Sequence, residues 1–286
     1  MATLMKVSVV IPTYYRREDL AELFDSLLKQ TFKPFEVIVV DDTPTEEIAV
    51  LCDTFKGQFA KQKVHLIYHK NRKKKSLSVA RNVGVEKSSG DILMFFDSDV
   101  ILFPDYIEKI LEVFKKFPYA VGVQGWIVNI KRTKFYYIRQ VIYRIFRFSH
   151  HVKDRCKLFE YPSSLTRIVQ CEALIGANFA IKREVFNELR FDENLLGYAY
   201  MEDMLFSHTL FKKHPNGLFI TPYAKCIHKV SQEGRGEKKE LEKHKRACRL
   251  YVLTKLFGWK GKLLYCWQNA GGLILLFFKR IIKNIF

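Results

Sequence analysis

The sequence predicts an α/β fold in which helices cover both faces of a mostly parallel central sheet. Two observations support this prediction. Apolar and β-branched runs recur through the first hundred residues, and helical patterns separate them. The runs are apolar throughout instead of alternating with polar residues, which is typical of strands that are buried on both faces.

Four strands and three helices are expected in this first part of the chain. The strands are expected at residues 6–12, 35–42, 63–69 and 91–97. The helices are expected at residues 18–30, 44–57 and 77–88. The first helix has the strongest pattern, because its apolar residues repeat at spacings of three and four: Leu20, Leu23, Phe24, Leu27 and Leu28.

The second half of the chain mixes strands and helices less regularly. Strands are expected at 118–130 and 217–229, and residues 171–182 are interpreted as a strand pair or a strand and a loop. Helices are expected at 182–190 and 202–214, the second of which ends before a Pro and an Asn-Gly pair. No internal repeat is present in the sequence.

Composition limits the class of protein. The 286 residues are 48% hydrophobic, which is enough for the core of one large domain or two small ones. Lys and Arg number 48 against 30 Asp and Glu, so a net charge of +18 favours an anionic partner such as nucleic acid, acidic lipid or a phosphorylated ligand. The six cysteines include no C-x-x-C pair, which argues against a zinc site.

Two segments combine basic and apolar residues. Residues 131–157 hold nine Lys or Arg and one acid, and residues 238–286 hold twelve Lys or Arg and two acids. We interpret 135–148 and 263–286 as amphipathic helices with a cationic face, which is typical of helices that lie at a membrane surface. The alternative is that they pack against the catalytic domain or a second subunit. The apolar run 263–278 is too short to span a bilayer, and the N-terminus lacks a signal peptide, so a cytoplasmic location is expected.

Acidic residues follow two of the predicted strands. The buried strand that ends at Phe96 runs into Asp97 and Asp99, and an earlier strand ends at Asp41 and Asp42. Ligands of parallel α/β sheets bind at the carboxyl ends of the strands. Two carboxylates separated by one residue suit a hard divalent cation, and the alternative is a solvated turn or a helix cap.

The order of these motifs resembles a known family. The stretches "VSVVIPTYYRREDLAELFDSLLKQTFKPFEVIVVDDTPTEE", "LSVARNVGVEKSSGDILMFFDSDV" and "GANFAIKREVFNELRFDENLLGYAYMEDMLFSHTLFKKH" are similar to the inverting glycosyltransferases of family two, over about residues 6–232. The resemblance implies the GT-A fold, a Rossmann-like sheet with flanking helices. Two departures are "DDTPTE" for the usual acid-Gly-Ser pattern and "NRKKKSLS" for a Gly-rich loop.

The resemblance implies residues for the nucleotide of the donor. The loop Pro12, Thr13 and Tyr14 would lie along the nucleoside, and Asp42, with Asp41 beside it, would bind the base. The remaining donor residues that the resemblance implies are Arg16, Arg81, Asp97 and Ser98. From the residues alone, Asp41 and Asp42 could instead cap the helix that follows them, and Arg81 could lie on a helix surface.

The resemblance also implies a metal site and a catalytic pair. Asp99, Asp97 and His228 would hold Mn²⁺ or Mg²⁺. Asp203 would be the general base, with Glu202 beside it as an acceptor or a contact of the metal shell. The loop Gly176, Ala177 and Asn178 would lie under the sugar and the acceptor. The alternatives are that Glu202 and Asp203 interact with a helix dipole and that His228 is structural.

The sequence therefore predicts a catalytic domain over residues 1–232, with 131–157 as a basic insertion, and a membrane-associating segment over 233–286. The expected activity is metal-dependent, inverting transfer of a sugar from a UDP- or GDP-linked donor to a hydroxyl of a lipid-linked glycan acceptor. The location expected is the inner face of the cell membrane, at an anionic lipid surface. Base, sugar, acceptor and oligomeric state stay open.

Three alternatives are weaker. A polyprenyl (dolichol) phosphate sugar synthase is the nearest one, although its long acceptor-loop pattern is not evident after Asp99. A nucleic-acid-binding protein would suit the charge but leaves the acids at the strand ends unexplained, so no nucleic acid is expected as a partner. A nucleotidyltransferase would need a Gly-rich phosphate loop near the first strand, and "PTYYRRE" is not one.

Overall fold

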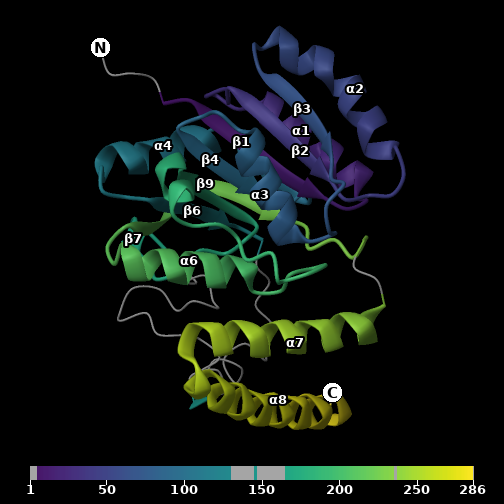
Figure 1. The fold of residues 1–286 in the computed structure, drawn as a ribbon, viewed down its shortest axis with the longest axis vertical. Coiled ribbons are helices and arrows are strands. Elements are labelled where there is room, and N and C mark those ends of the chain that lie inside the picture. Colours follow the sequence, from purple (N-terminus) through teal and green to yellow (C-terminus); the bar gives the residue numbers. More distant parts are fainter. Residues whose placement is uncertain (1–4, 130–144, 147–164, 235–236, 286) are drawn as a thin grey trace.

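The computed structural model describes residues 5–129, 145–146, 165–234 and 237–285. In this part of the chain, nine strands form one twisted sheet. Eight of them follow the order β3-β2-β1-β4-β8-β6-β9-β5, and β7 pairs with β9. Helices lie on both faces of the sheet, and two further helices follow it at the C-terminal end of the chain (Figure 1).

The first half is the parallel part of the sheet, as predicted. The strands are β1 (Val7–Thr13), β2 (Glu36–Asp41), β3 (His65–Lys70) and β4 (Ile92–Phe96). The helices between them are α1 (Arg17–Leu28), α2 (Glu47–Lys61) and α3 (Leu77–Lys87). β2, β1 and β4 are buried along their whole length, which explains the uninterrupted apolar runs.

The second half closes the sheet with mixed pairing. The strands are β5 (Val100–Leu102), β6 (Gly122–Ile127), β7 (Val169–Gln170), β8 (Asn178–Lys182) and β9 (Leu218–His228). β8 runs antiparallel to both β4 and β6, whereas β6 and β9 are parallel. The region 171–182 is therefore a loop followed by one strand, which is the second of the two forms that the sequence allowed.

The remaining helices of this half agree only partly with the expectations. α6 (Glu202–Lys213) matches the predicted helix at 202–214. The helix predicted at 182–190 is wrong in type, because Arg183–Asn187 forms a short 3-10 helix, η1. α4 (Tyr106–Lys116) is not among the predicted helices, although its residues Tyr106, Ile107, Ile110, Leu111, Val113 and Phe114 are buried.

Two hydrophobic cores form on the two faces of the sheet. Val7, Val9 and Ile11 of β1 point to the face that α1, α2 and α4 cover, whereas Val10 points to the opposite face. On that opposite face the aromatic rings of Phe95, Phe179, Phe186, Phe191 and Phe206 pack against one another. Since β1, β2, β4, β8 and β9 each supply side chains to both cores, these strands are held rigidly beneath the loops at the edge of the sheet.

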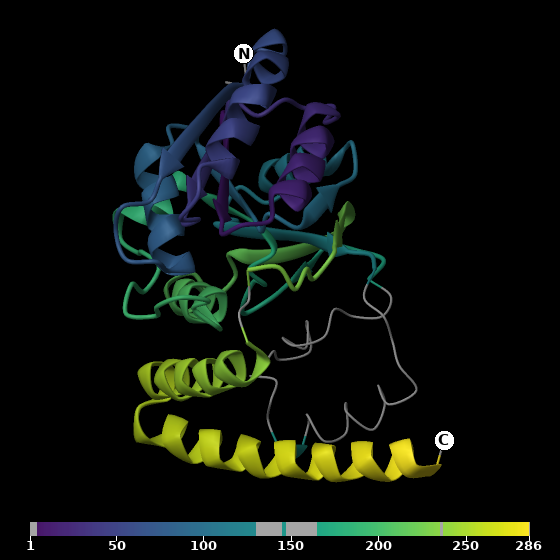
Figure 2. The same cartoon turned by 90° about the vertical axis from the view of Figure 1, so that its right-hand side faces the viewer.

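Two long helices end the chain. α7 (Lys238–Phe257) lies between α6 and α8 (Trp259–Ile285), and α8 is farthest from the sheet (Figure 2). The amphipathic helix predicted at 263–286 corresponds to most of α8. The one predicted at 135–148 lies outside the described residues except for Ile145 and Phe146. Among the described helices, none combines the length and the apolar character that crossing a membrane requires.

The contact between α3 and β1 generates a stability prediction. A Cβ atom added at Gly84 of α3 would collide with the side chain of Val10, whereas one added at Gly57 of α2 would meet nothing within 4 Å. We expect Gly84→Ala to lower the free energy of unfolding by about 1–3 kcal/mol, because overpacking forces the helix from the sheet. Gly57→Ala, the matched control, should raise it by about 0.5–1 kcal/mol. Urea unfolding measures the free energy of unfolding of both variants. Equal changes in the two variants would contradict the close contact between Gly84 and Val10.

Candidate functional site

The candidate site lies at the edge of the sheet where β1, β2 and β4 end. Two cavities open there, of about 680 Å³ and about 290 Å³. The larger cavity is lined by Pro12, Thr13, Tyr14, Arg16, Asp42, Ser98 and other residues. The smaller cavity is lined by Arg81, Gly176, Ala177, Glu202, Asp203 and others. Asp97 and His228 line both, so the two cavities adjoin at these side chains.

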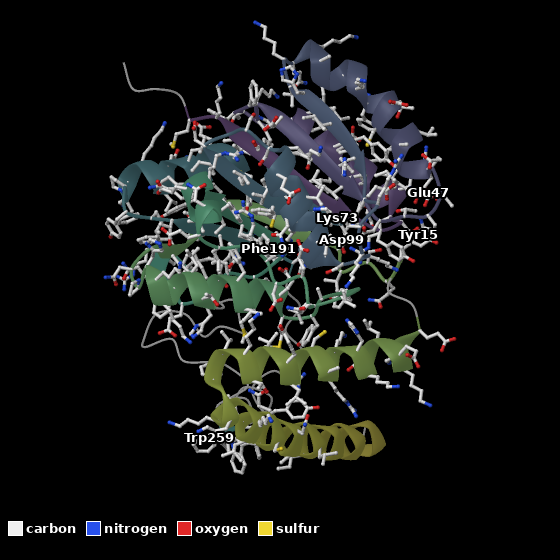
Figure 3. All side chains as sticks on the ribbon, in the orientation of Figure 1. Tyr15, Glu47, Lys73, Asp99, Phe191 and Trp259 are labelled. Atoms are coloured by element: carbon white, nitrogen blue, oxygen red, sulfur yellow. The ribbon has the colours of Figure 1, made fainter. Side chains whose placement is uncertain are left out.

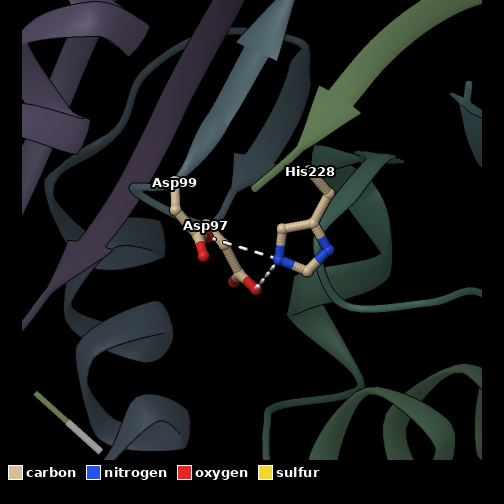
Figure 4. Close-up of side chains that lie close together, drawn as sticks. All are labelled: Asp97, Asp99 and His228. Atoms are coloured by element: carbon tan, nitrogen blue, oxygen red, sulfur yellow. Dashed lines mark ion pairs between the residues drawn. The ribbon is translucent and has the colours of Figure 1, made fainter. Parts of the chain in front are cut away.

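Asp97, Asp99 and His228 form a compact group at this junction. Nε2 of His228 lies 3.3 Å from Oδ1 of Asp99 and 4.0 Å from Oδ2 of Asp97 (Figure 4). One potential ligand atom from each residue lies within 4.8 Å of the others. Strand pairing accounts for the closeness, because β5 and β9 are antiparallel with Val100 opposite His228. The structure thus brings together the three predicted metal ligands.

Asp99 is held as a buried carboxylate. Its Oδ1 lies 3.3 Å from Nη1 of Arg16, and its Oδ2 accepts a hydrogen bond of 2.8 Å from the backbone N–H of Ser231. Burial opposes ionisation of Asp99, but the hydrogen bond from His228, the charge of Arg16 and the Ser231 N–H outweigh it. Together they lower the pKa of Asp99 to about 2.

The donor atoms fit a hard divalent cation. Two carboxylates and one imidazole suit Mn²⁺ or Mg²⁺, and no cysteine belongs to the group. Oδ1 of Asp99 is buried and lies 3.3 Å from Nε2 of His228. A buried carboxylate oxygen close to an imidazole nitrogen is suitably placed to share a metal ion with it.

A second charged group surrounds Arg81, which is fully buried in α3. Its Nη1 contacts Oε1 of Glu202, and its Nη2 lies 3.2 Å from Oδ1 of Asp97 and donates a 2.7 Å hydrogen bond to the Gly176 carbonyl. The resemblance implies Arg81 as a donor-binding residue. The structure places its guanidinium between Asp97 and Glu202, and Arg81 lines the smaller cavity but not the larger one.

The two acids of α6 differ in exposure. Glu202 is 2% exposed, whereas Asp203 is only partly buried and faces the smaller cavity. The backbone N–H groups of Gly176 and Met204 donate hydrogen bonds of 2.6 and 2.8 Å to the Asp203 carboxylate. Burial raises the pKa of Asp203 and raises that of Glu202 to about 8, although the charge of Arg81 opposes both shifts. Of the two carboxylates, that of Asp203 is the more accessible to a ligand in the smaller cavity.

The larger cavity has the loop after β1 on one side. Tyr15 and Arg16 adopt left-handed backbone conformations with φ of 57° and 63°, and this turn directs the Arg16 guanidinium back to Asp99. Nearby, Nζ of Lys75 lies 3.2 Å from the centre of the Tyr14 ring. Asp42 accepts a 2.5 Å hydrogen bond from Asn71, and burial raises the pKa of Asp42.

Besides Asp99 of the candidate metal group, two predicted site residues line neither cavity. Asp41 is fully buried, and its carboxylate accepts hydrogen bonds from the Thr43 N–H, the Tyr68 hydroxyl and the Lys70 ammonium. Asn178 is also fully buried in β8 and donates to the sulfur of Cys226. In each case the neighbouring predicted residue, Asp42 or Ala177, lines a cavity instead.

Several lining residues carry no site signal in the sequence. They come from the loop before α6 and from α7: Gly197, Tyr198, Glu240, Leu241 and His244. Lys75, which belongs to the segment "NRKKKSLS", also lines the larger cavity. Nothing in the local sequence of α7 distinguishes Glu240, Leu241 and His244 from residues of an ordinary amphipathic helix. They line the cavity only because α7 docks against parts of the chain that are distant in sequence.

The sequence matches a known family. The profile described as Glycosyl transferase family 2 matches residues 8–190. The chain is 35% identical over 126 residues to glucosyl-dolichyl phosphate glucuronosyltransferase of Haloferax volcanii, which covers 43% of this chain and 39% of that one. It is 29% identical over 196 residues to glycosyltransferase GlyA of Streptococcus pneumoniae, which covers 67% and 26%. The chain thus spans well under half the length of these two relatives.

Solved glycosyltransferase structures share the fold. The mannosyltransferase PcManGT of Pyrobaculum calidifontis, in complex with GDP-Man and Mn²⁺, has a TM-score of 0.62 at 17% identity, covering 96% of this chain and 72% of that one. S. aureus TarS in complex with UDP-GlcNAc has a TM-score of 0.57 at 16% identity, covering 91% and 70%. These likenesses identify the sheet and its helices as the GT-A fold.

The carboxyl group of Glu202 generates a pH prediction. Its pKa is about 8 in the folded protein against an ordinary value of 4.5, so the folded state binds more protons between these values. Stability should therefore fall as pH rises from about 5 to 8, by up to about 1.4 kcal/mol per pH unit. Glu202→Gln should flatten this slope. Urea unfolding in EDTA across that range tests it, and parallel curves for both proteins would refute the assignment.

Proposed function

The chain belongs to glycosyl transferase family 2, and on this premise we propose that it is a metal-dependent, inverting glycosyltransferase. It would move a sugar from a nucleoside-diphosphate sugar to a hydroxyl group of an acceptor. One observation carries the proposal, namely that Asp97 and His228 lie at the junction of the two cavities. A donor in the larger cavity would therefore present its reacting end to the smaller one.

The larger cavity suits a nucleoside diphosphate. Asp42 offers an acceptor to the N–H groups of a base, and the aromatic ring of Tyr14 offers an apolar surface. Arg16 lies at the Asp99 end of the cavity, where a diphosphate next to the metal group would meet its guanidinium. A divalent cation held by Asp97, Asp99 and His228 would offset the negative charge that develops on the leaving diphosphate.

The smaller cavity suits the acceptor and the proton transfer. We assign the general base to Asp203, because its carboxylate faces this cavity and burial raises its pKa toward the working range of a base. Glu202 is buried against Arg81 and does not reach the acceptor, so we assign it a positioning role. With one base and one displacement from the face opposite the diphosphate, the configuration of the anomeric carbon would be inverted.

Nucleotide binding tests the proposal. We expect either UDP or GDP to raise the melting temperature of the protein in the presence of Mn²⁺ and to have little effect in EDTA. Asp99→Asn should abolish the metal-dependent shift, because it removes a buried ligand that is ionised down to pH about 2. Asp203→Asn should keep the shift, since this carboxylate lies in the smaller cavity. Differential scanning fluorimetry measures the melting temperature of each protein with UDP or GDP, in Mn²⁺ or in EDTA.

The exposed acid Asp25 of α1 provides the matched control, because Asp25→Asn removes the same charge far from the cavities. This control should behave like the wild type. Absence of any nucleotide effect on the wild type, or a full Mn²⁺-dependent shift in Asp99→Asn, would overturn the proposal.

We further propose that α8 binds an anionic membrane surface. Trp259, Leu263 and Leu273 are 66%, 61% and 69% exposed, and the basic residues Lys260 and Lys262 are exposed among them. Trp259 projects from the helix on the side of the molecule away from Asp99 (Figure 3). Aromatic and aliphatic side chains beside Lys are typical of helices that lie in the headgroup region.

The segment before β7 contributes to the same surface. The Trp267 indole N–H donates a 3.1 Å hydrogen bond to the carbonyl of Ile145, and the Phe146 ring lies 4.8 Å from the Trp267 ring. Ile145 is itself 57% exposed. Ile145 and Phe146, the two described residues of the basic segment 131–157, thus contact α8, and the exposed Ile145 side chain enlarges the apolar surface that a membrane could cover.

A membrane location favours a lipid-linked acceptor on the cytoplasmic face. The relative from Haloferax volcanii is named for a glucosyl-dolichyl phosphate, which is a sugar on a lipid phosphate. An enzyme held at the surface by α8 would meet such an acceptor without extracting it from the bilayer. We therefore propose a lipid-linked glycan as the acceptor class, with the base and the sugar of the donor left open.

Vesicle flotation tests the membrane proposal. We expect the protein to float with vesicles that contain phosphatidylglycerol, and the Trp259→Ala, Leu263→Ala double variant to bind at least about tenfold more weakly, because two apolar anchors are lost. Tyr119→Ala is the control, since Tyr119 is 56% exposed but belongs to the catalytic part. Binding to DNA in rising salt without binding to vesicles would contradict the proposal.

A further inference from the structure

We infer that α7 is a donor-binding element, in which Leu241 and His244 contact the nucleoside diphosphate. The inference rests on the proposed function and adds to it residues that lie outside the matched family region, 8–190. Leu241 and His244 line the larger cavity together with Tyr14 and Asp42. A nucleotide bound in this cavity would therefore have α7 as one of its walls.

One stripe of α7 has two different neighbours along its length. Leu241, His244, Cys248 and Val252 follow one another at spacings of three and four, so they lie on one face of the helix. Cys248 and Val252 are 5% and 0% exposed and pack in a hydrophobic cluster. Leu241 and His244, in the first half of the same stripe, extend beyond this cluster into the wall of the larger cavity.

The docking of α7 is well defined by its contacts. The cluster that receives Cys248 and Val252 is formed by the loop before α6 and by α6 itself, through Leu195, Ala199, Met201, Met204 and Leu205. The Tyr251 hydroxyl and the Lys255 ammonium also contact the Asp192 carboxylate, at 2.9 and 2.5 Å. These contacts fix the second half of α7 and with it the direction in which the first half extends.

The loop that receives α7 is tied in turn to α3 at the cavity. Gly197 donates to the carbonyl of Lys75 and accepts from the N–H of Leu77, and the Ser76 hydroxyl donates to the carbonyl of Leu195. A Cβ atom added at Gly197 would lie 3.8 Å from Nε2 of His244. His244 is thus seated over Gly197, next to the side of the cavity where Lys75 contacts Tyr14.

The position of α7 assigns it to the donor and not to the acceptor. Glu240, Leu241 and His244 line the larger cavity, and no described residue of α7 lines the smaller one with Asp203. Leu241 can supply apolar contact and His244 a hydrogen bond to the nucleotide. Losing either should weaken the binding of the nucleoside diphosphate itself, with or without an attached sugar.

The experiment measures the affinity of two variants by calorimetry. UDP and GDP are titrated in Mn²⁺ into the full-length wild type, Leu241→Ala and His244→Ala. For the nucleotide that the wild type binds, each variant should raise Kd about three- to tenfold, as expected for one lost hydrogen bond or one partly buried side chain. Lys243→Ala is the matched control, because Lys243 is exposed on the other side of α7 and should leave Kd unchanged.

A second measurement uses only the wild type, in case a variant undocks α7. Hydrogen exchange of the amides in residues 238–248 should slow when the nucleotide and Mn²⁺ are bound. Unchanged Kd in both folded variants, or unchanged exchange where the variants do not fold, overturns the inference while the proposed function stands. A wild type that binds neither nucleotide overturns the proposed function and this inference together.

Discussion

The buried guanidinium of Arg81 is the interaction on which the geometry of the site depends. It joins Asp97 after β4, Glu202 at the start of α6 and the Gly176 carbonyl before β8. A buried charge is tolerated only where partners surround it, so these three elements are held at fixed separations. Because Asp97 also belongs to the group with Asp99 and His228, one network relates the proposed metal site to the position of Asp203. The rings of Phe179 and Phe191 lie 5.2 and 5.6 Å from the guanidinium carbon and keep solvent from it.

The surroundings of each acidic residue separate the carboxylates that could contact a metal or a substrate from those that make structural contacts. The neighbours of Asp99, among them the Arg16 guanidinium, lower its pKa, so its carboxylate is ionised at any physiological pH, which suits a metal ligand. The charge of Arg81 acts on both Glu202 and Asp203, and burial raises the pKa of both. Both residues line the smaller cavity, but Glu202 is 2% exposed whereas Asp203 is only partly buried. The Asp41 carboxylate accepts hydrogen bonds from residues of the fold, whereas Asp42, one residue later, lines the larger cavity. Residue type alone does not separate these roles; burial and partners do.

The C-terminal helices carry the surfaces proposed for two partners. The stripe of α7 faces α6 and the larger cavity, whereas α8, which has exposed apolar side chains, is the helix farthest from the sheet (Figure 2). The proposed donor-binding helix α7 therefore lies between the proposed membrane-binding helix α8 and the catalytic part. The positive charge of the chain suits both partners, because nucleoside diphosphates and anionic lipids present phosphate groups.

The sequence by itself determined the parallel half of the sheet and the family. It also showed that acidic residues follow β2 and β4, because the apolar runs of the strands and the acids at their ends are local features of the sequence. The family resemblance also implied Asp97, Asp99 and His228 as metal ligands, and the strand register that pairs Val100 with His228 brings these three residues together. The sequence did not reveal α4, the 3-10 helix at Arg183–Asn187 or the burial of Asp41 and Asn178. Only the tertiary structure decided that Arg81 sits among acids and that Leu241 and His244 reach a cavity. Those facts depend on contacts between residues far apart in the chain, and no local pattern records such contacts.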